Sequence, residues 1–237
     1  MRAMILAAGL GTRLRPLTNR LPKALVPVAG VPMLEILLQR MELAGFTQVA
    51  VNAHHVASQV KDFLVQFRQR TTLQLYYSYE PIILNTGGGI KKMLDFFADE
   101  TPILVHNVDI LTALDYGELV RHHIATGAQA TLVIHRHATD RPLTFDSNNQ
   151  FLGRAHRPMK SQGSDFSFCG IQVIQPSLFR TVKENIFYSI DLYVKAAASG
   201  EIIKGYDISG QYWRDIGTLD DLEMAARDIK QDFFQLP

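Results

Sequence analysis

Short apolar runs alternate with amphipathic stretches along most of the chain. Residues 3–8 are apolar throughout and are followed by Gly9, which is typical of a strand buried on both faces of a parallel sheet. In residues 33–43 the apolar positions instead recur every three or four residues, as on one face of a helix. The same reasoning predicts strands over residues 49–53, 73–79, 103–105 and 130–135, and helices over residues 56–67, 89–98 and 115–125. This alternation predicts βαβ units in a doubly wound sheet.

After residue 141 the predicted segments become shorter. One hairpin is predicted from strands 143–145 and 151–154, and a second one over residues 202–213 with its turn at Gly210. Thr218 precedes a last amphipathic helix with acidic residues in its first turn, which is the pattern of a capped helix start. The segments expected between the hairpins are a polar loop over residues 159–164, a core strand over residues 168–174 and a helix over residues 190–198.

These segments predict one α/β domain over residues 1–237. The expected fold class is a Rossmann-like, doubly wound, mainly parallel (mixed) sheet flanked by helices, with a smaller antiparallel lobe. We place a nucleotide-type lobe in residues 1–111, the more antiparallel lobe in residues 112–217 and a C-terminal helix in residues 218–237.

Composition narrows the classes of function. Of 237 residues, 24 are Lys or Arg and 23 are Asp or Glu, so the net charge of +1 offers no bulk attraction to nucleic acid, and an anionic ligand must be held locally. Cys169 is the only cysteine, which excludes an internal disulfide and suits the reducing cytoplasm. No apolar run is long enough to cross a membrane, so we expect a cytoplasmic protein without a membrane partner.

The segment after the first predicted strand carries the densest chemical signal. Residues 9–32 contain four Pro, three Gly, four basic residues and no acid. Glycines at the end of such a strand let backbone N–H groups approach a phosphate, while Arg13 and Lys23 bring two positive charges. A Walker A loop is absent, and the dinucleotide fingerprint fails because Leu14 stands where its third glycine belongs. The remaining pattern is Leu6, Ala7, Ala8, Gly9, Gly11, Thr12 and Arg13 followed by Pro22 and Lys23, in which the small Ala7 and Ala8 leave room for a flat base.

Two aspartates could face the same crevice. Asp109 follows the buried strand over residues 103–105, and Asp215 follows the second predicted hairpin. Carboxylates from distant segments suit a Mg²⁺ ion that completes its shell with water and phosphate oxygens. The alternative is that each aspartate only caps a turn or a helix. The triple glycine over residues 87–89 could expose bare backbone to a base or could simply be the start of a helix.

The segment over residues 6–35 resembles the signature of the sugar-phosphate nucleotidyltransferases. Later segments follow that family's order: residues 86–89, residues 107–109, residues 168–171 and residues 213–218. The resemblance implies that Arg13, Lys23 and Asp109 are catalytic and that Mg²⁺, the expected cofactor, binds Asp109 and Asp215. It implies nucleotide binding by Leu6, Ala7, Ala8, Gly9, Gly11, Thr12, Arg13, Lys23, Thr86, Gly87 and Gly88. It implies sugar-phosphate binding by Asn107, Arg157 and Gly170, in the lobe over residues 112–217 and at its border.

The implied reaction joins a nucleoside triphosphate and a sugar 1-phosphate to give a nucleotide sugar and pyrophosphate. The pattern is most similar to small uridylyltransferases acting on N-acetylmuramate 1-phosphate, which favours UTP. Mannose 1-phosphate guanylyltransferases, phosphocholine cytidylyltransferases and a non-catalytic sensor of nucleotide sugars stay open as alternatives. This chain departs from the family at Val108, where glycine is frequent, and at residues 141–143, where a sugar-side glycine is missing.

Overall fold

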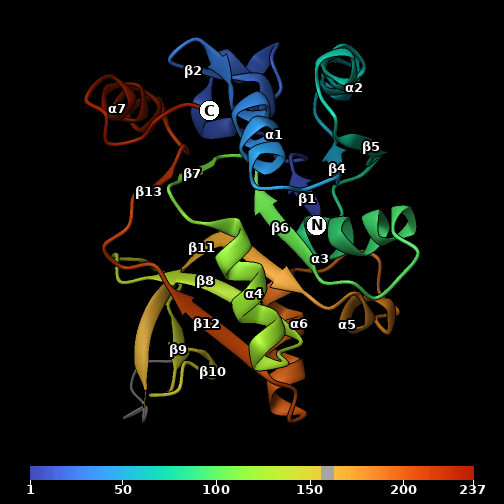
Figure 1. Ribbon diagram of the computed structural model, residues 1–237, viewed down its shortest axis with the longest axis vertical. Helices are drawn as coiled ribbons and strands as arrows, with labels where there is room; N and C mark the ends of the chain where they lie inside the picture. Colours follow the sequence, from blue (N-terminus) through green and yellow to red (C-terminus); the bar gives the residue numbers. More distant parts are fainter. Residues whose placement is uncertain (156–162) are drawn as a thin grey trace.

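The computed structural model describes residues 1–155 and 163–237 (Figure 1). Its strands are β1 (Arg2–Leu6), β2 (Pro27–Val28), β3 (Val31–Pro32), β4 (Gln48–Ala53), β5 (Gln74–Tyr79), β6 (Ile103–Asn107), β7 (Ile110–Thr112), β8 (Ala130–His135), β9 (Leu143–Phe145), β10 (Phe151–Arg154), β11 (Ser164–Ile174), β12 (Ile203–Asp207) and β13 (Trp213–Asp215). Its helices are α1 (Met33–Leu43), α2 (Ala57–Phe67), α3 (Asn85–Met93), α4 (Tyr116–Thr126), α5 (Pro176–Arg180), α6 (Ser189–Ala198) and α7 (Leu219–Lys230). Short 3₁₀ helices cover Thr12–Leu14, Leu17–Asn19, Lys23–Leu25, Arg68–Arg70 and Leu94–Phe96.

One mixed sheet forms the centre of the molecule. Nine strands pair in it within the described residues, along the path β10-β9-β11-β6-β1-β4-β5, with β8 joined to β11 and β12 joined to β8. Strands β6, β1, β4 and β5 are parallel to one another, while β11 runs antiparallel to β6. This arrangement confirms the predicted fold class of a doubly wound, mixed sheet.

Helices cover both faces of the sheet, as the apolar first strand predicts. Ala3 and Ile5 of β1 face a core that includes side chains of α1, α2 and α4, and Met4 between them faces a second core with α3, α5 and α6. Both faces of a central parallel strand are therefore buried, which is why it reads as a continuous apolar run. Among the described helices, none is long and apolar enough to pass through a membrane.

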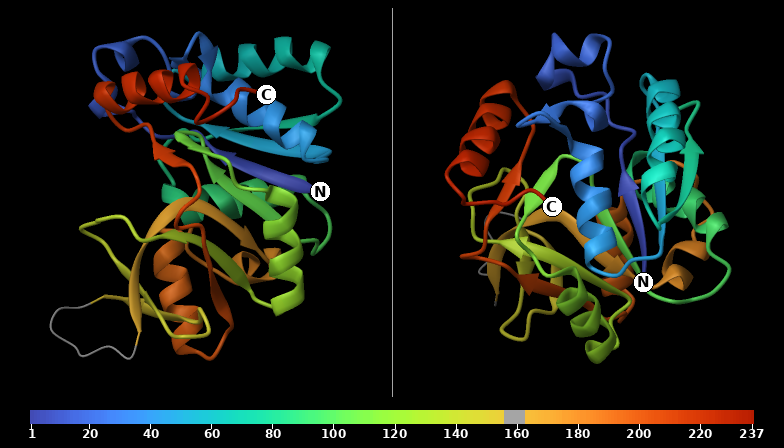
Figure 2. Two further views of the ribbon diagram at one scale, coloured as in Figure 1. Left: turned by 60° about the vertical axis from the view of Figure 1, so that its left-hand side comes forward. Right: turned by 45° about the horizontal axis from the view of Figure 1, so that its top comes forward.

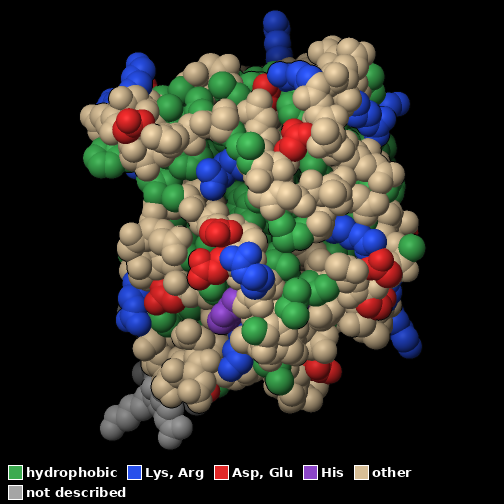
Figure 3. All heavy atoms as spheres, in the orientation of Figure 1, with side chains coloured by type: hydrophobic (Ala, Val, Ile, Leu, Met, Phe, Trp, Pro, Cys, Tyr) green, Lys and Arg blue, Asp and Glu red, His purple; other side chains and the backbone are tan. Residues whose placement is uncertain are grey.

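The C-terminal part of the chain packs against the glycine-rich segment and the start of α1. A third core joins Val28 and Met33 to Ala225 of α7, so that the last helix lies beside a segment almost two hundred residues earlier in the sequence (Figure 2). Thr218 caps this helix: its hydroxyl accepts from the Asp221 N–H and the Asp221 carboxylate accepts from the Thr218 N–H. The predicted helix start at Thr218 is thus confirmed. On the face shown in Figure 3, basic and acidic side chains are interspersed.

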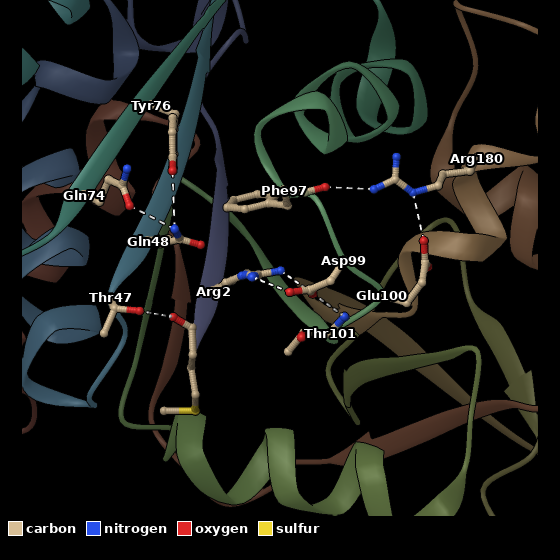
Figure 4. A network of polar contacts seen from close by, with 11 residues as sticks. Arg2, Thr47, Gln48, Gln74, Tyr76, Phe97, Asp99, Glu100, Thr101 and Arg180 are labelled. Atoms are coloured by element: carbon tan, nitrogen blue, oxygen red, sulfur yellow. Dashed lines mark hydrogen bonds and ion pairs between the residues drawn. The ribbon is translucent and has the colours of Figure 1, made fainter.

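Polar side chains fasten the amino ends of the parallel strands, opposite the site described below (Figure 4). Arg2 at the start of β1 makes a two-armed ion pair with Asp99, which also accepts from the Thr101 N–H at 2.8 Å. At the start of β4 and β5, the Gln48 side-chain amide donates to Gln74 Oε1 at 2.9 Å. Both contacts join segments that are distant in sequence.

Three predicted segments need correction. The hairpin over residues 202–213 is wrong: β12 pairs in parallel with β8 in the main sheet, and β13 pairs antiparallel with β7. Strand β7 follows Asp109 directly and was missed, so the partner of β13 could not be identified. The helix expected over residues 89–98 begins earlier, at Asn85, and ends at Met93 before a 3₁₀ turn. The polar loop over residues 159–164 lies largely outside the described residues, and Ser164 already belongs to β11.

Candidate active site

A cavity of about 450 Å³ lies at the carboxyl ends of the parallel strands. Leu6 ends β1, Asn107 ends β6, and both line it. In an open α/β sheet this edge is where ligands bind. The predicted site residues that line the cavity are Leu6, Ala8, Gly9, Gly11, Thr12, Arg13, Lys23, Thr86, Asn107 and Asp109. The predicted residues Ala7, Gly87, Gly88, Gly170 and Asp215 do not line it, and Arg157 lies outside the described residues.

The glycine loop is folded back on itself. Gly11 has a φ of 61°, in the left-handed region that glycine enters without strain. A Cβ there would lie 3.0 Å from Thr18 Cγ2 and 3.1 Å from Lys23 Cβ, so the loop packs closely against the segment that carries the lysine. The Thr18 hydroxyl donates to the Gly11 carbonyl at 2.7 Å and closes the turn. The local sequence therefore brings Lys23 beside the glycines.

Lys23 and Asp109 form an ion pair at the bottom of the loop. Lys23 is only 8% exposed, and its carboxylate partner comes from a segment 86 residues later in the chain. A nearly buried ammonium needs such a partner because an unpaired buried charge is strongly destabilising. Two candidate site residues from separate segments of the sequence are thus in contact.

Asp215 lies next to this pair. The Ile216 N–H donates to the Asp109 carbonyl at 2.8 Å, which ties the end of β13 to the turn after β6. Burial raises the pKa of Asp215, and so does the negative charge of Asp109, whereas Lys23 and Arg13 act in the opposite direction. Oδ1 of Asp215 is buried and has no hydrogen-bond partner among the described residues. Asp215 thus interacts electrostatically with three other charged groups, namely Asp109, Lys23 and Arg13.

This carboxylate pair fits a divalent cation. A buried carboxylate oxygen with no donor is costly to desolvate, and a cation that binds it removes that cost. The described residues contain no group of three or more His, Cys, Asp or Glu side chains placed to hold a metal ion together. Any metal at Asp109 and Asp215 would therefore take its other ligands from water or from phosphate oxygens, as Mg²⁺ does in many phosphate sites.

Arg13 reaches the same region from the glycine loop. A Cβ at Gly217 would lie 2.6 Å from a terminal nitrogen of Arg13, so the guanidinium packs over the backbone that follows Asp215. Gly217 lines the cavity together with Arg13. A side chain at residue 217 would displace the Arg13 guanidinium from this place.

Gly170 packs against Asn107, which lines the cavity. Gly170 has a φ of 76°, and a Cβ there would lie 2.8 Å from Asn107 Nδ2. Below them His106 is fully buried, and burial lowers its pKa to about 4. The neutral ring donates through Nδ1 to the Asn107 carbonyl at 2.7 Å and accepts at Nε2 from the Tyr116 hydroxyl at 3.1 Å. The backbone before Asp109 is therefore held by a buried histidine.

Close packing against the segment before α6 explains Gly87 and Gly88 of the triple glycine. Gly87 and Gly88 lie inside α3, and their N–H groups donate to the Phe187 carbonyl at 2.9 and 3.3 Å. A Cβ at Gly87 would overlap the Phe187 ring, and one at Gly88 would overlap the Asn185 carbonyl. The segment before α6 can approach α3 only because these positions lack side chains.

Several lining residues were missed. Leu10, Asn52, Glu80, Ile83, Asn85, Val108, Tyr188 and Gly217 line the cavity without having been predicted as site residues. Asn52 and Glu80 are 2% and 1% exposed. One signal was present in the sequence: Asn52 is polar within the apolar strand over residues 49–53. A buried polar residue needs a partner, and its partner is Glu80.

Comparisons with known proteins agree on one family. A family model described as nucleotidyl transferase matches residues 2–232. The UTP–glucose-1-phosphate uridylyltransferase of Synechocystis sp. is 31% identical over 97% of this chain, which spans 63% of that longer relative. The N-acetylmuramate alpha-1-phosphate uridylyltransferase of Neisseria meningitidis serogroup B is 30% identical over 95% of this chain and 96% of its own length. The crystal structure of HddC from Yersinia pseudotuberculosis superposes with a TM-score of 0.79 at 20% identity, covering 96% of this chain and 99% of that one.

Proposed function

The chain belongs to the nucleotidyl transferase family, and on that premise we propose that it transfers a nucleotidyl group from a nucleoside triphosphate to a sugar 1-phosphate. The products are a nucleotide sugar and pyrophosphate. The observation that carries this proposal is that the glycine loop, Arg13, Lys23 and Asp109 line one cavity, with Asp215 next to Asp109. Such a cavity offers both cations for phosphates and carboxylates for a metal.

The reaction needs positioning more than it needs a base. An oxygen of the sugar phosphate attacks the α-phosphorus, the bond from that phosphorus to the β-phosphate oxygen breaks, and pyrophosphate leaves. The attacking oxygen is already anionic near neutral pH, so no general base has to remove a proton. In this scheme Lys23 contacts the α-phosphate and Arg13 neutralises the departing pyrophosphate, which are electrostatic roles.

We assign the metal site to Asp109 and Asp215. When bound there, Mg²⁺ would offset the negative charge that the two substrates bring together. Lys23, which is paired with Asp109 in the structure, would then exchange one anionic partner for another. Asn107, Arg157 and Gly170 remain our candidates for contacts to the sugar phosphate.

UTP is the nucleotide we favour. Its support is that two relatives named above are uridylyltransferases, one of which matches this chain over nearly its whole length. The acceptor is assigned only as a sugar 1-phosphate. We place the protein in the cytoplasm because its lone Cys169 is a buried free thiol, which suits a reducing compartment.

A release assay tests this function. The protein would be mixed with Mg²⁺, each of UTP, GTP, CTP, dTTP and ATP, and a panel of glucose, mannose and N-acetylmuramate 1-phosphates and phosphocholine. We expect pyrophosphate only when a sugar 1-phosphate is present, fastest with UTP, and its loss when EDTA removes the metal. Nucleotide binding without pyrophosphate in any mixture would refute the transferase and favour a sensor.

A further inference from the structure

A buried series of hydrogen bonds runs along the wall of the cavity and joins three neighbouring strand ends. The Ala7 N–H, just after β1, donates to Asn52 Oδ1 at 2.6 Å. Asn52 Nδ2, on β4, donates to Glu80 Oε1 at 2.7 Å, and Glu80 Oε2, just after β5, accepts from the Leu84 N–H at 3.1 Å. The contacts bridge 45, 28 and 4 positions of sequence. They connect the start of the glycine loop to the loop that precedes α3.

Only certain arrangements of donors and acceptors satisfy these three hydrogen bonds. Both ends of the series are backbone N–H groups, which can only donate. Asn52 must therefore accept from the Ala7 N–H, and Glu80 must accept from the Leu84 N–H. In addition, one of these two side chains must donate to the other. An amide accepts on one side and donates on the other, while a carboxylate accepts on both sides. One amide and one carboxylate satisfy every contact, whereas two amides leave an N–H group facing a backbone N–H group, and two ionised carboxylates leave two acceptors facing each other.

The helix behind the pair leaves it no room to move away. A Cβ at Gly89 would lie 2.8 Å from Asn52 Nδ2 and 2.9 Å from Glu80 Oε1. The third glycine of α3 thus lets the helix backbone press directly against the two polar side chains. Because the pair is almost fully buried, a polar atom that loses its partner there costs free energy.

The position of these three hydrogen bonds indicates their role. The ends of the series are the backbone at Ala7, in the predicted nucleotide segment, and the loop at Leu84, one residue before the cavity-lining Asn85. A change in any of the three contacts would alter the spacing between these two walls. A displacement of about 1 Å at a binding site weakens ligand binding, because the contacts with the ligand depend on distance.

We propose that Asn52 and Glu80 are positioning residues that set the spacing of the nucleotide cavity, and that they need one amide and one carboxylate without regard to which position carries which. This proposal rests on the proposed function only for the identity of the ligand. It makes a prediction that a direct contact between Glu80 and the nucleotide does not make: exchanging the two groups should preserve function.

The test uses the single variants N52D and E80Q and the exchanged double variant N52D/E80Q. Each single variant leaves one mismatched buried contact, worth roughly 1–3 kcal/mol, so we expect its Kd and KM for the favoured nucleotide to rise about 5- to 150-fold. The value of kcat should change by less than about threefold. The double variant restores all three contacts in reversed order, and we expect its Kd and KM within about threefold of the unaltered protein, with the same preference among nucleotides.

The matched control is Q48E. Gln48 and Gln74 form an amide contact between the same two strands, β4 and β5, at their opposite ends (Figure 4). Placing a carboxylate there should leave the Kd and KM for nucleotide unchanged. This control separates an effect on the cavity from a general effect of altered charge on the sheet.

Titration of Mg²⁺-nucleotide by calorimetry, alongside turnover, keeps the two proposals apart. If the unaltered protein binds nucleotide but transfers it to no acceptor, the proposed function fails and the binding data still test the pair. If a single variant does not fold, the double variant, in which every contact is satisfied, decides the matter. Single variants that bind normally, or a folded double variant that is as impaired as E80Q or has a changed nucleotide preference, would overturn the positioning role.

Discussion

Lys23 illustrates how one side chain can link the fold to the chemistry. It packs against Gly11 through its Cβ and pairs with Asp109 through its ammonium group. The ion pair therefore holds the glycine loop against the turn after β6, where the cavity lies. Removing the ammonium would take a positive charge from the proposed phosphate site and would leave Asp109 and Asp215 without their nearest cation.

We expect Lys23→Ala to lower the rate of pyrophosphate release by roughly 100- to 1000-fold, because loss of one preorganised electrostatic contact typically costs that much. Lys230→Ala removes an exposed lysine from the last turn of α7 and should change the rate by less than about twofold. The assay is steady-state release, with the thermal unfolding midpoint measured for both variants. A folded Lys23→Ala protein with near-normal turnover would contradict the role.

His123 gives a prediction about acid stability. Its ring is buried, Nδ1 contacts the Thr131 hydroxyl at 2.9 Å, and burial lowers its pKa to about 4. Since the unfolded chain has a histidine pKa near 6.5, it binds more protons than the folded protein between pH 6.5 and pH 4. Stability should therefore be full above about pH 6.5 and should fall as the pH drops towards 4.

The size of the effect can be checked with His123→Gln, which keeps a polar partner for Thr131 and does not titrate. Between pH 7 and pH 5 one such histidine contributes a loss of about 2 kcal/mol in the free energy of unfolding. His106, whose pKa is lowered in the same way, contributes a similar loss. Denaturant unfolding at several pH values should show a shallower pH dependence for the variant. An unchanged dependence would contradict the assignment.

At the level of single residues, the sequence predicted those side chains whose chemistry is visible in a local pattern. Arg13 and Lys23 belong to one glycine-rich segment, and Asp109 follows an apolar strand, so pattern and position both marked them. Asn52 and Glu80 were missed because their role depends on hydrogen bonds between three strand ends. Such contacts are set by the order of strands in the sheet, which no local pattern contains.

The start of α3 shows what a helix gains from residues that usually weaken helices. Glycine destabilises a helix interior by about 1 kcal/mol relative to alanine. At Gly87 the absent side chain makes room for the Phe187 ring, and the free N–H groups bind the Phe187 carbonyl. The first turn of α3 is thereby joined to the segment that leads into α6.

We expect Gly87→Ala to destabilise the protein by about 1–3 kcal/mol, because the added methyl overlaps the Phe187 ring and forces it to move. Gly117 in the first turn of α4 is the control. A Cβ there meets only side-chain atoms of Arg121 and Asp115, each at 3.2 Å, so Gly117→Ala should leave stability unchanged or raise it by up to about 1 kcal/mol. Equal midpoints of thermal unfolding for the two variants would contradict the packing account.

Helices and strands with a strong hydrophobic periodicity were predicted well. Strands that depend on which other strand they pair with were not. The helix over residues 33–43 and the strands over residues 130–135, 143–145 and 151–154 have the observed bounds. The hairpin over residues 202–213 failed because two strands that are close in sequence need not pair. β12 instead completes the sheet beside β8, and β13 pairs with β7, which brings Asp215 next to Asp109.

At the scale of the whole molecule, the site exists because the sheet joins distant segments. The parallel strands β6, β1, β4 and β5 place their carboxyl ends side by side, and β13 adds Asp215 from near the end of the chain. The Arg2–Asp99 pair fastens the amino ends of the same sheet, 97 positions apart in sequence. The division into lobes over residues 1–111 and 112–217 stays a prediction, and the continuous pairing of β6 with β11 leads us to expect a single cooperative unfolding transition.

A crystal structure of the protein with Mg²⁺ and a non-reacting UTP analogue tests the central claim most directly. The account predicts that the triphosphate lies along the glycine loop within reach of Arg13 and Lys23, with the metal between the phosphates and the carboxylates of Asp109 and Asp215. A nucleotide bound outside this cavity, for example in the larger groove between α3 and Arg180, would contradict it.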